Sequence, residues 1–110
     1  MIDRTRGYFD RKKEKMSKGE QEAYLKERLS EILQYGYRLS KAIRLRFDAV
    51  GLMPEEVKDL KDLEKLPITK KADLVSSQRE APPFGGLEIS PRQGLRRIYV
   101  SPGPVFEPGE

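Results

Sequence analysis

The sequence predicts a mainly α-helical fold, a helical hairpin plus short helices, with one or two short β-strands at the C-terminal end. Between positions 17 and 80, apolar residues recur at three- and four-residue spacing, and residues that favour helix ends flank these stretches. From position 81 the chain changes to Pro/Gly-rich loops and one run of β-branched and aromatic residues. These observations divide the chain into an extended basic arm (1–16), a helical scaffold (17–80) and a C-terminal part (81–110) of loop, strand and turn.

The composition limits what the chain can do alone. Of its 110 residues, 36% are hydrophobic, 36% are charged and none is Trp, so any hydrophobic core is thin. The absence of Cys and His excludes disulfides, thiolate metal sites and Ser-His-Asp catalysis. We therefore expect no complete catalytic site, and no metal or cofactor held by this chain.

The N-terminal arm is basic but carries no recognition motif. No apolar leader follows Met1, and no run approaches the ~20 apolar residues that span a bilayer, so we expect a cytoplasmic protein without a membrane partner. The basic run at 11–15 is typical of a solvated surface, and weak nucleic-acid binding remains only a minor alternative.

The first long helix is predicted to begin at a capping box. Ser17 and Glu20 have the spacing at which a hydroxyl and a carboxylate satisfy free N–H groups at a helix start. Gly36 is expected to end or bend the helix, because glycine is a poor helix former. The apolar stripe of this helix comprises Leu25, Leu29, Ile32 and Leu33.

A second helix is predicted between Ser40, as its cap, and Gly51, as the residue just past its end. A short link containing Gly36 would join the two helices into an αα-hairpin. Its apolar stripe comprises Leu39, Ile43, Phe47 and Val50.

Short helical turns are predicted next. Pro54 favours a helix start, the leucines that follow indicate turns broken near Lys61, and Pro67 ends them. Thr69 is then expected to cap a last helix, with Asp73 bonding back to the cap.

The C-terminal part contains one strand candidate, Leu95 to Val100, and a shorter alternating stretch at 87–89. Neither has a partner long enough to pair with. The sequence therefore predicts an unfinished sheet, whose backbone groups would be satisfied elsewhere.

Two stretches resemble the N-terminal region of phenylacetate-CoA ligases, which belong to the adenylate-forming (AMP-binding, acyl-CoA synthetase) superfamily. They are the segment at 46–52 (RFDAVGL) and the segment at 60–74 (LKDLEKLPITKKADL). Tyr-Phe-Asp at 8–10 is similar to the family's opening, and Pro-Phe-Gly-Gly at 83–86 is similar to the motif before its first core strand. The resemblance implies the incomplete N-terminal part of an α/β adenylate-forming fold.

The resemblance also implies an activity for the complete enzyme. Such ligases use ATP, Mg²⁺ and CoA to convert an acid to its acyl-CoA, and the segments that do this lie beyond position 110. This chain would be a fragment or subunit that is not catalytically competent alone. Its partner would be the remainder of the ligase, missing or separately encoded, or a second copy of itself. A stand-alone helical interaction module is the main alternative.

The resemblance places the family's phosphate loop at 101–109, just after the predicted strand. Only Ser101 and Gly103 match it, and they are the candidate cofactor-binding residues. A phosphate loop needs consecutive backbone N–H donors, but Pro102, Pro104 and Pro108 have none. We therefore expect an altered phosphate-loop-like turn, and we favour a purely structural, proline-fixed role for it over phosphate binding.

Overall fold

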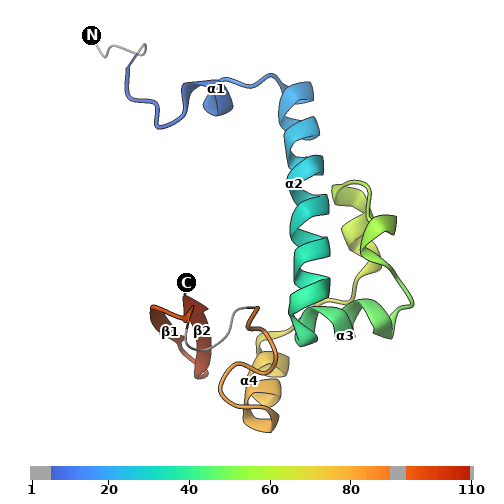
Figure 1. Ribbon diagram of the computed structural model, residues 1–110, viewed down its shortest axis with the longest axis vertical. Helices are drawn as coiled ribbons and strands as arrows, with labels where there is room; N and C mark the ends of the chain where they lie inside the picture. Colours follow the sequence, from blue (N-terminus) through green and yellow to red (C-terminus); the bar gives the residue numbers. More distant parts are fainter. Residues whose placement is uncertain (1–5, 90–93, 110) are drawn as a thin grey trace.

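The computed structural model describes residues 6–89 and 94–109, and helices dominate them (Figure 1). The predicted fold class is confirmed: the structure is mainly helical and ends in a two-stranded antiparallel hairpin. The elements in chain order are α1 (Arg11–Glu14), α2 (Lys18–Leu39), α3 (Lys41–Ala49), the 3₁₀ turns η1 (Pro54–Glu56) and η2 (Leu60–Lys65), α4 (Lys71–Glu80), β1 (Arg97–Ser101) and β2 (Val105–Gly109).

The N-terminal arm is not extended throughout, because α1 forms one helical turn within it. Asp10 caps that turn by accepting a hydrogen bond from the Lys13 N–H at 3.1 Å. The Lys13 ammonium also lies 5.5 Å from the centre of the Tyr24 ring on α2. Similarly, the Lys15 ammonium lies 5.2 Å from the Tyr8 ring. Two lysines of the basic run therefore contact aromatic rings.

The capping box that begins α2 is confirmed. The Ser17 N–H donates to Glu20 Oε2 at 2.8 Å, and the Glu20 N–H donates to Ser17 Oγ at 3.3 Å. These bonds lower the pKa of the Glu20 carboxyl, with the backbone bond from Ser17 as the main cause. The predicted end at Gly36 is wrong, since α2 continues to Leu39. A Cβ at Gly36 would lie 3.4 Å from Ile43 Cγ2, so the small residue lets α3 approach.

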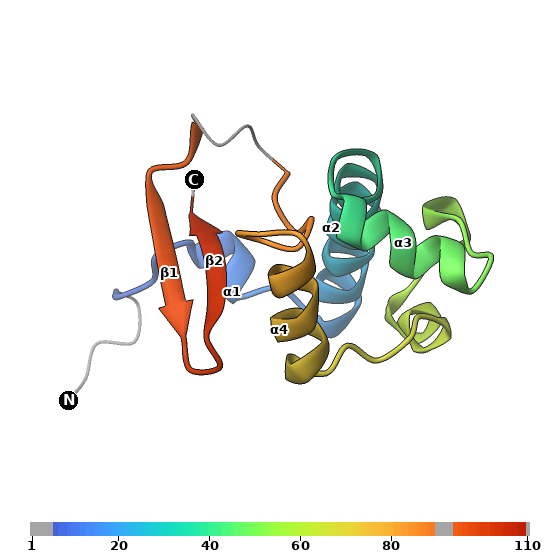
Figure 2. The same cartoon turned by 90° about the horizontal axis from the view of Figure 1, so that it is seen from below.

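A corner, rather than the predicted hairpin, joins α2 to α3. Only Ser40 separates the two helices, and α3 runs across the end of α2 instead of back along it (Figures 1 and 2). Ser40 is the predicted cap of α3, and its Oγ accepts a hydrogen bond from the Ile43 N–H at 3.4 Å. Gly51, at φ +64°, follows α3 in the left-handed conformation that the sequence predicts there.

The hydrophobic core lies where α2, α3 and the 3₁₀ turns meet. Its buried centre is Phe47, whose ring packs edge-on against Tyr37 at a centroid distance of 5.7 Å. Around it, only part of each predicted stripe faces inward. Leu52 and Val57 complete the buried cluster, and Leu29, Leu33, Tyr37, Ile43, Leu63 and Leu66 pack against it.

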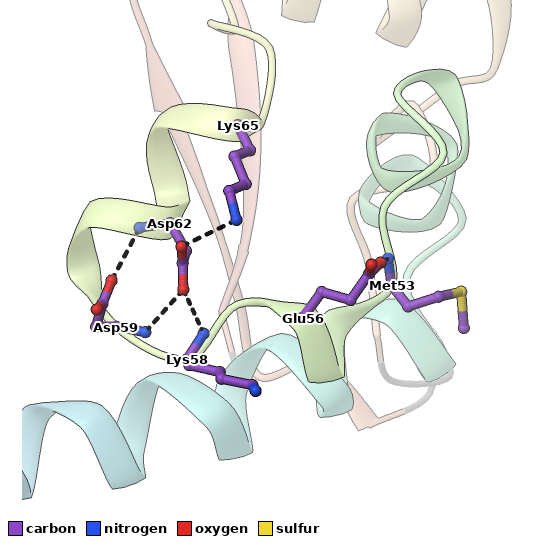
Figure 3. A network of polar contacts seen from close by, with 6 residues as sticks. All are labelled: Met53, Glu56, Lys58, Asp59, Asp62 and Lys65. Carbon is purple, nitrogen blue, oxygen red and sulfur yellow. Dashed lines mark hydrogen bonds and ion pairs between the residues drawn. The ribbon is translucent and has the colours of Figure 1, made fainter.

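The two 3₁₀ turns break at 57–59 rather than near Lys61, and backbone-to-carboxylate bonds fix the break (Figure 3). Asp62 Oδ2 accepts from the Lys58 N–H at 2.9 Å and from the Asp59 N–H at 3.3 Å. Lys65 Nζ lies 3.1 Å from the other Asp62 oxygen. The Lys58 N–H bond, followed by the Lys65 contact, holds the pKa of Asp62 below its ordinary value.

The last helix, α4, begins one residue later than predicted. Lys70 is its N-cap, and Asp73 Oδ2 accepts the Lys70 N–H at 3.0 Å, so the bond back from Asp73 is as expected. Thr69 does not cap the helix. Its hydroxyl instead accepts a hydrogen bond from Arg46 Nε at 2.8 Å, which ties this segment to α3.

The loop after α4 connects it to the start of α3. Phe84 is fully buried, and the Gly86 carbonyl accepts from the Ala42 N–H at 3.0 Å and from Ser40 Oγ at 2.9 Å. Gly85 has φ +64°, and a Cβ there would lie 2.9 Å from the Ser77 carbonyl carbon. The Pro-Phe-Gly-Gly motif therefore packs against two helices, and glycine is required at its centre.

The prediction that the C-terminal strand has no partner is wrong. Residues 97–101 form β1, and residues 105–109 form a second strand, β2, that pairs with it. The stretch at 87–89 is not a strand. The register of the pair is Arg97 with Gly109, Ile98 with Pro108, Tyr99 with Glu107, Val100 with Phe106 and Ser101 with Val105.

Candidate functional site

The turn at 102–104, between β1 and β2, occupies the position that the sequence assigns to an altered phosphate loop. Ser101 ends β1 and pairs with Val105, so the structure places it at the base of the turn. Gly103 lies at the exposed tip with φ +151°. The two candidate residues are therefore neighbours on one hairpin, which packs against α4.

Gln78 on α4 fixes the hairpin in place. Its Nε2 donates to the Phe106 carbonyl at 2.8 Å, and its Oε1 accepts the Phe106 N–H at 2.8 Å. Gln78 is itself buried. Figure 2 shows the result: β2 lies between α4 and β1, and β1 is the outer strand.

The two hydrogen bonds of Gln78, which we call the Gln78 clamp, also show which backbone groups of the hairpin point outward. Because both backbone polar groups of Phe106 point toward α4, Phe106 and its partner Val100 form a non-hydrogen-bonded pair. By alternation, Ser101 and Val105 form a hydrogen-bonded pair, so their backbone groups are directed toward each other.

The donors at the turn do not fit a phosphate group. Of the three residues between the strands, only Gly103 has an N–H, because Pro102 and Pro104 have none. One side of Gly103 is already filled: a Cβ there would lie 3.3 Å from Val75 Cγ2 and 3.4 Å from Lys71 Cε. A single N–H is not the ring of N–H donors that holds phosphate. The assignment of Ser101 and Gly103 as cofactor ligands stays a prediction, and we derive no ATP-dependent step from this turn.

Sequence reasoning missed two residues of this region, Lys71 and Gln78. Lys71 brings the side chain of a cation beside the turn, although it lies 32 positions before Gly103. No local pattern connects position 78 with position 106, because the bond depends on how α4 packs. Within the described ranges, no group of three or more acidic, His or Cys side chains could hold a metal ion.

A second candidate surface is an apolar groove along α2. It has a volume of about 540 Å³. Ile32 is 60% exposed and Leu60 is 53% exposed, so neither has been covered by the core. The side chains that line it are Leu25, Arg28, Leu29, Glu31, Ile32, Tyr35 and Leu60. No helix within the described residues is long and apolar enough to cross a membrane.

Comparison with known sequences identifies the relatives of this fold. The chain is 37% identical over 95 residues to the phenylacetate-coenzyme A ligase of Aromatoleum evansii, which covers 86% of this chain and 20% of that enzyme. It is 34% identical over 95 residues to the Escherichia coli K12 ligase of the same name, covering 86% of this chain and 21% of that enzyme. The chain is homologous to the N-terminal fifth of phenylacetate-CoA ligases. No protein-family model matches it.

Solved structures give the same result for the fold. A 2-hydroxyisobutyryl-CoA ligase in complex with R3-HIB-AMP superimposes with a TM-score of 0.85 at 26% identity, covering 96% of this chain and 23% of that one. An open conformation of the same ligase, with 2-HIB-AMP and CoA, gives a TM-score of 0.76 at 28% identity over 83% of this chain and 20% of that one. This chain therefore spans about a fifth of the length of the ligases it matches.

Proposed function

We propose that this chain is the N-terminal scaffold of an ATP-dependent phenylacetate-CoA ligase-like enzyme, as a fragment or a separate subunit, and that it is not catalytically competent alone. The complete enzyme would convert an acid, ATP and CoA to the acyl-CoA. The observation that carries the proposal is the match of 86% of this chain to a fifth of a phenylacetate-coenzyme A ligase.

The amount of exposed surface supports a role as part of a larger assembly. The chain has an accessible surface of 8890 Å². A compact monomer of 12.7 kDa has about 6,200 Å². The radius of gyration is 17.6 Å, against about 13 Å for a compact domain of this length. Surfaces that a self-contained domain would bury are open here.

The site supports the second half of the proposal. The hairpin turn has one free amide where a phosphate loop needs several, and the chain contains no His to act as a general base. ATP, Mg²⁺ and CoA would therefore be bound by the rest of the enzyme.

Reconstitution tests the proposal. The Aromatoleum evansii ligase lacking its N-terminal fifth would be purified with and without this chain, and ATP–pyrophosphate exchange would be measured with several aryl and fatty acids. We expect no exchange by the 110-residue chain alone, and stable co-purification of the chain with the shortened ligase. Exchange by the chain alone, or failure of the two parts to associate, would contradict the proposal.

A second candidate function is a stand-alone helical interaction module that pairs with its own copy. The observation that favours it is a stripe on α2 in which Leu25, Ile32 and Leu39 recur every seven residues and are 39%, 60% and 41% exposed. Seven-residue spacing is that of a coiled-coil seam. Light scattering tests it: a dimer that Ile32→Lys dissociates would support this function, and a monomer at all concentrations would exclude it.

A further inference from the structure

The two outer edges of the β-hairpin differ in how their backbone groups are used. On β2, Gln78 binds both the N–H and the carbonyl of Phe106 at 2.8 Å. The next outward residue on this edge is Pro108, which has no N–H to offer. The outer edge of β2 is therefore closed, by a side chain at one position and by a proline at the other.

The outer edge of β1 is open. Its outward residues are Ile98 and Val100, the register partners of Pro108 and Phe106. Neither makes an outward hydrogen bond to any described residue, and their side chains are 57% and 61% exposed. An edge with free N–H and carbonyl groups is a template for another strand.

The outward-facing positions of β1, 98 and 100, carry none of the devices that normally protect such an edge, and the exposed charge of this strand, Arg97, lies at its first residue. Natural proteins place Lys, Pro or a bulge on an exposed edge strand to prevent unwanted pairing. Ile98, Tyr99 and Val100 form a run with strong β propensity and no charge. The proline at this level of the hairpin, Pro108, protects β2, which α4 already covers. An unprotected edge beside a doubly protected one indicates that the edge has an occupant.

We propose that β1 is the growing edge of a sheet, and that an extended strand from the rest of the ligase pairs with Ile98 and Val100. The inference rests on the proposed function. The ligases that this chain matches are about five times its length, which supplies the strand. A ligase structure superimposes on 96% of this chain, while most of that ligase's own length lies outside the match.

Ile98→Pro tests the edge directly. Proline at 98 removes an outward N–H but no bond to β2, since Ile98 pairs with Pro108 across a non-hydrogen-bonded position. Ile98→Thr is the matched control, because it keeps the N–H and the β-branched shape. The probe is the Aromatoleum evansii ligase lacking its N-terminal fifth, and the Kd would be measured for each variant. We expect Ile98→Thr to bind like the parent chain and Ile98→Pro to bind about tenfold more weakly, the effect of losing one backbone hydrogen bond.

The outcomes separate this inference from the proposed function. If the parent chain does not bind the shortened ligase, both are overturned. If Ile98→Pro binds as tightly as the parent chain, the edge pairing is wrong and the proposed function stands. If the parent chain forms a dimer that Ile98→Pro dissociates, the occupant is a second copy and the inference is overturned. Hydrogen exchange of the unmodified chain is a second measurement that needs no variant: the Val100 amide should gain at least tenfold protection in the complex, and unchanged exchange would contradict the pairing.

Discussion

The helical region and the C-terminal hairpin are held together in different ways. Both α2 and α3 begin at a serine cap, and one buried cluster around Phe47 joins them to the 3₁₀ turns. The hairpin is held against α4 by the two hydrogen bonds of Gln78 and by packing of its turn against Val75. The difference shows that local signals can fix the helices alone, whereas the hairpin is oriented by α4 and leaves its other edge for a partner.

The largest effect should come from removing the centre of the core. Phe47→Ala should lower the free energy of unfolding of the helical region by about 3–5 kcal/mol, because it leaves a cavity that the thin core cannot fill. The exposed Leu45→Ala on the same helix is the control and should change it by less than about 0.5 kcal/mol. Urea unfolding followed by far-ultraviolet circular dichroism measures both. Similar values for the two variants would contradict the assigned core.

Gly51 and Gly85 have the same φ of +64°. Substituting each by alanine therefore distinguishes the cost of backbone strain from the cost of close packing. Gly51→Ala meets no atom within 4 Å, so it should cost only about 1–2 kcal/mol of left-handed strain. Gly85→Ala places a Cβ 2.9 Å from the Ser77 carbonyl carbon, and should cost a further ~1–3 kcal/mol from overpacking. Thermal unfolding of both variants gives the difference. Equal costs would mean that the loop at 82–86 does not pack on α4 as described.

The clamp on the hairpin predicts a local effect. Gln78→Leu removes both bonds to Phe106 and should weaken the attachment of the hairpin by about 2 kcal/mol. The core around Phe47 should keep its stability. Hydrogen exchange at single residues measures this: the Phe106 amide should exchange faster, while amides in α3 are unchanged. Loss of protection in both regions together would show that they unfold as one unit.

The smallest effect concerns pH. The pKa of Asp62 is lowered by the Lys58 N–H bond first and by Lys65 next, so the charged form is favoured in the folded state. Its contribution is fully present above the ordinary pKa of 3.8 and is lost as the pH falls through the lowered folded value. The Asp62→Asn variant should therefore have a lower free energy of unfolding than the parent chain at pH 7. This difference between the two proteins should become smaller below pH 3.8. The free energy of unfolding of both proteins would be measured as the pH is lowered, and a difference that does not change with pH would contradict this.

Features determined by neighbouring residues could be predicted from the sequence. The capping box of Ser17 and Glu20, the cap at Ser40 and the left-handed Gly51 were all identifiable, because each depends on atoms within a few residues. The helix boundary at Gly36 could not be predicted. The ~1 kcal/mol that glycine costs a helix is offset there by the close approach of Ile43, which is a tertiary contact.

Only the first strand of the hairpin could be predicted from the sequence, because the pairing with β2 also depends on tertiary contacts. Pro104 and Pro108 predict a turn, so β2 was missed. Pro108 is compatible with a strand because its missing N–H would point away from β1. The resemblance to ligases places a loop at 101–109, which includes the observed turn at 102–104, but the packing of Lys71 and Val75 against Gly103 depends on the folded chain.

The most direct test of this account compares the amides of two residues that are paired across the hairpin. Val100 and Phe106 are register partners, and both amides point outward. In the isolated chain, the Phe106 amide should exchange slowly because it donates to Gln78 at 2.8 Å, and the Val100 amide should exchange at close to the unfolded rate because its edge is open. Equal protection of the two amides in the monomeric chain would contradict the closed and open edges on which the docking role rests.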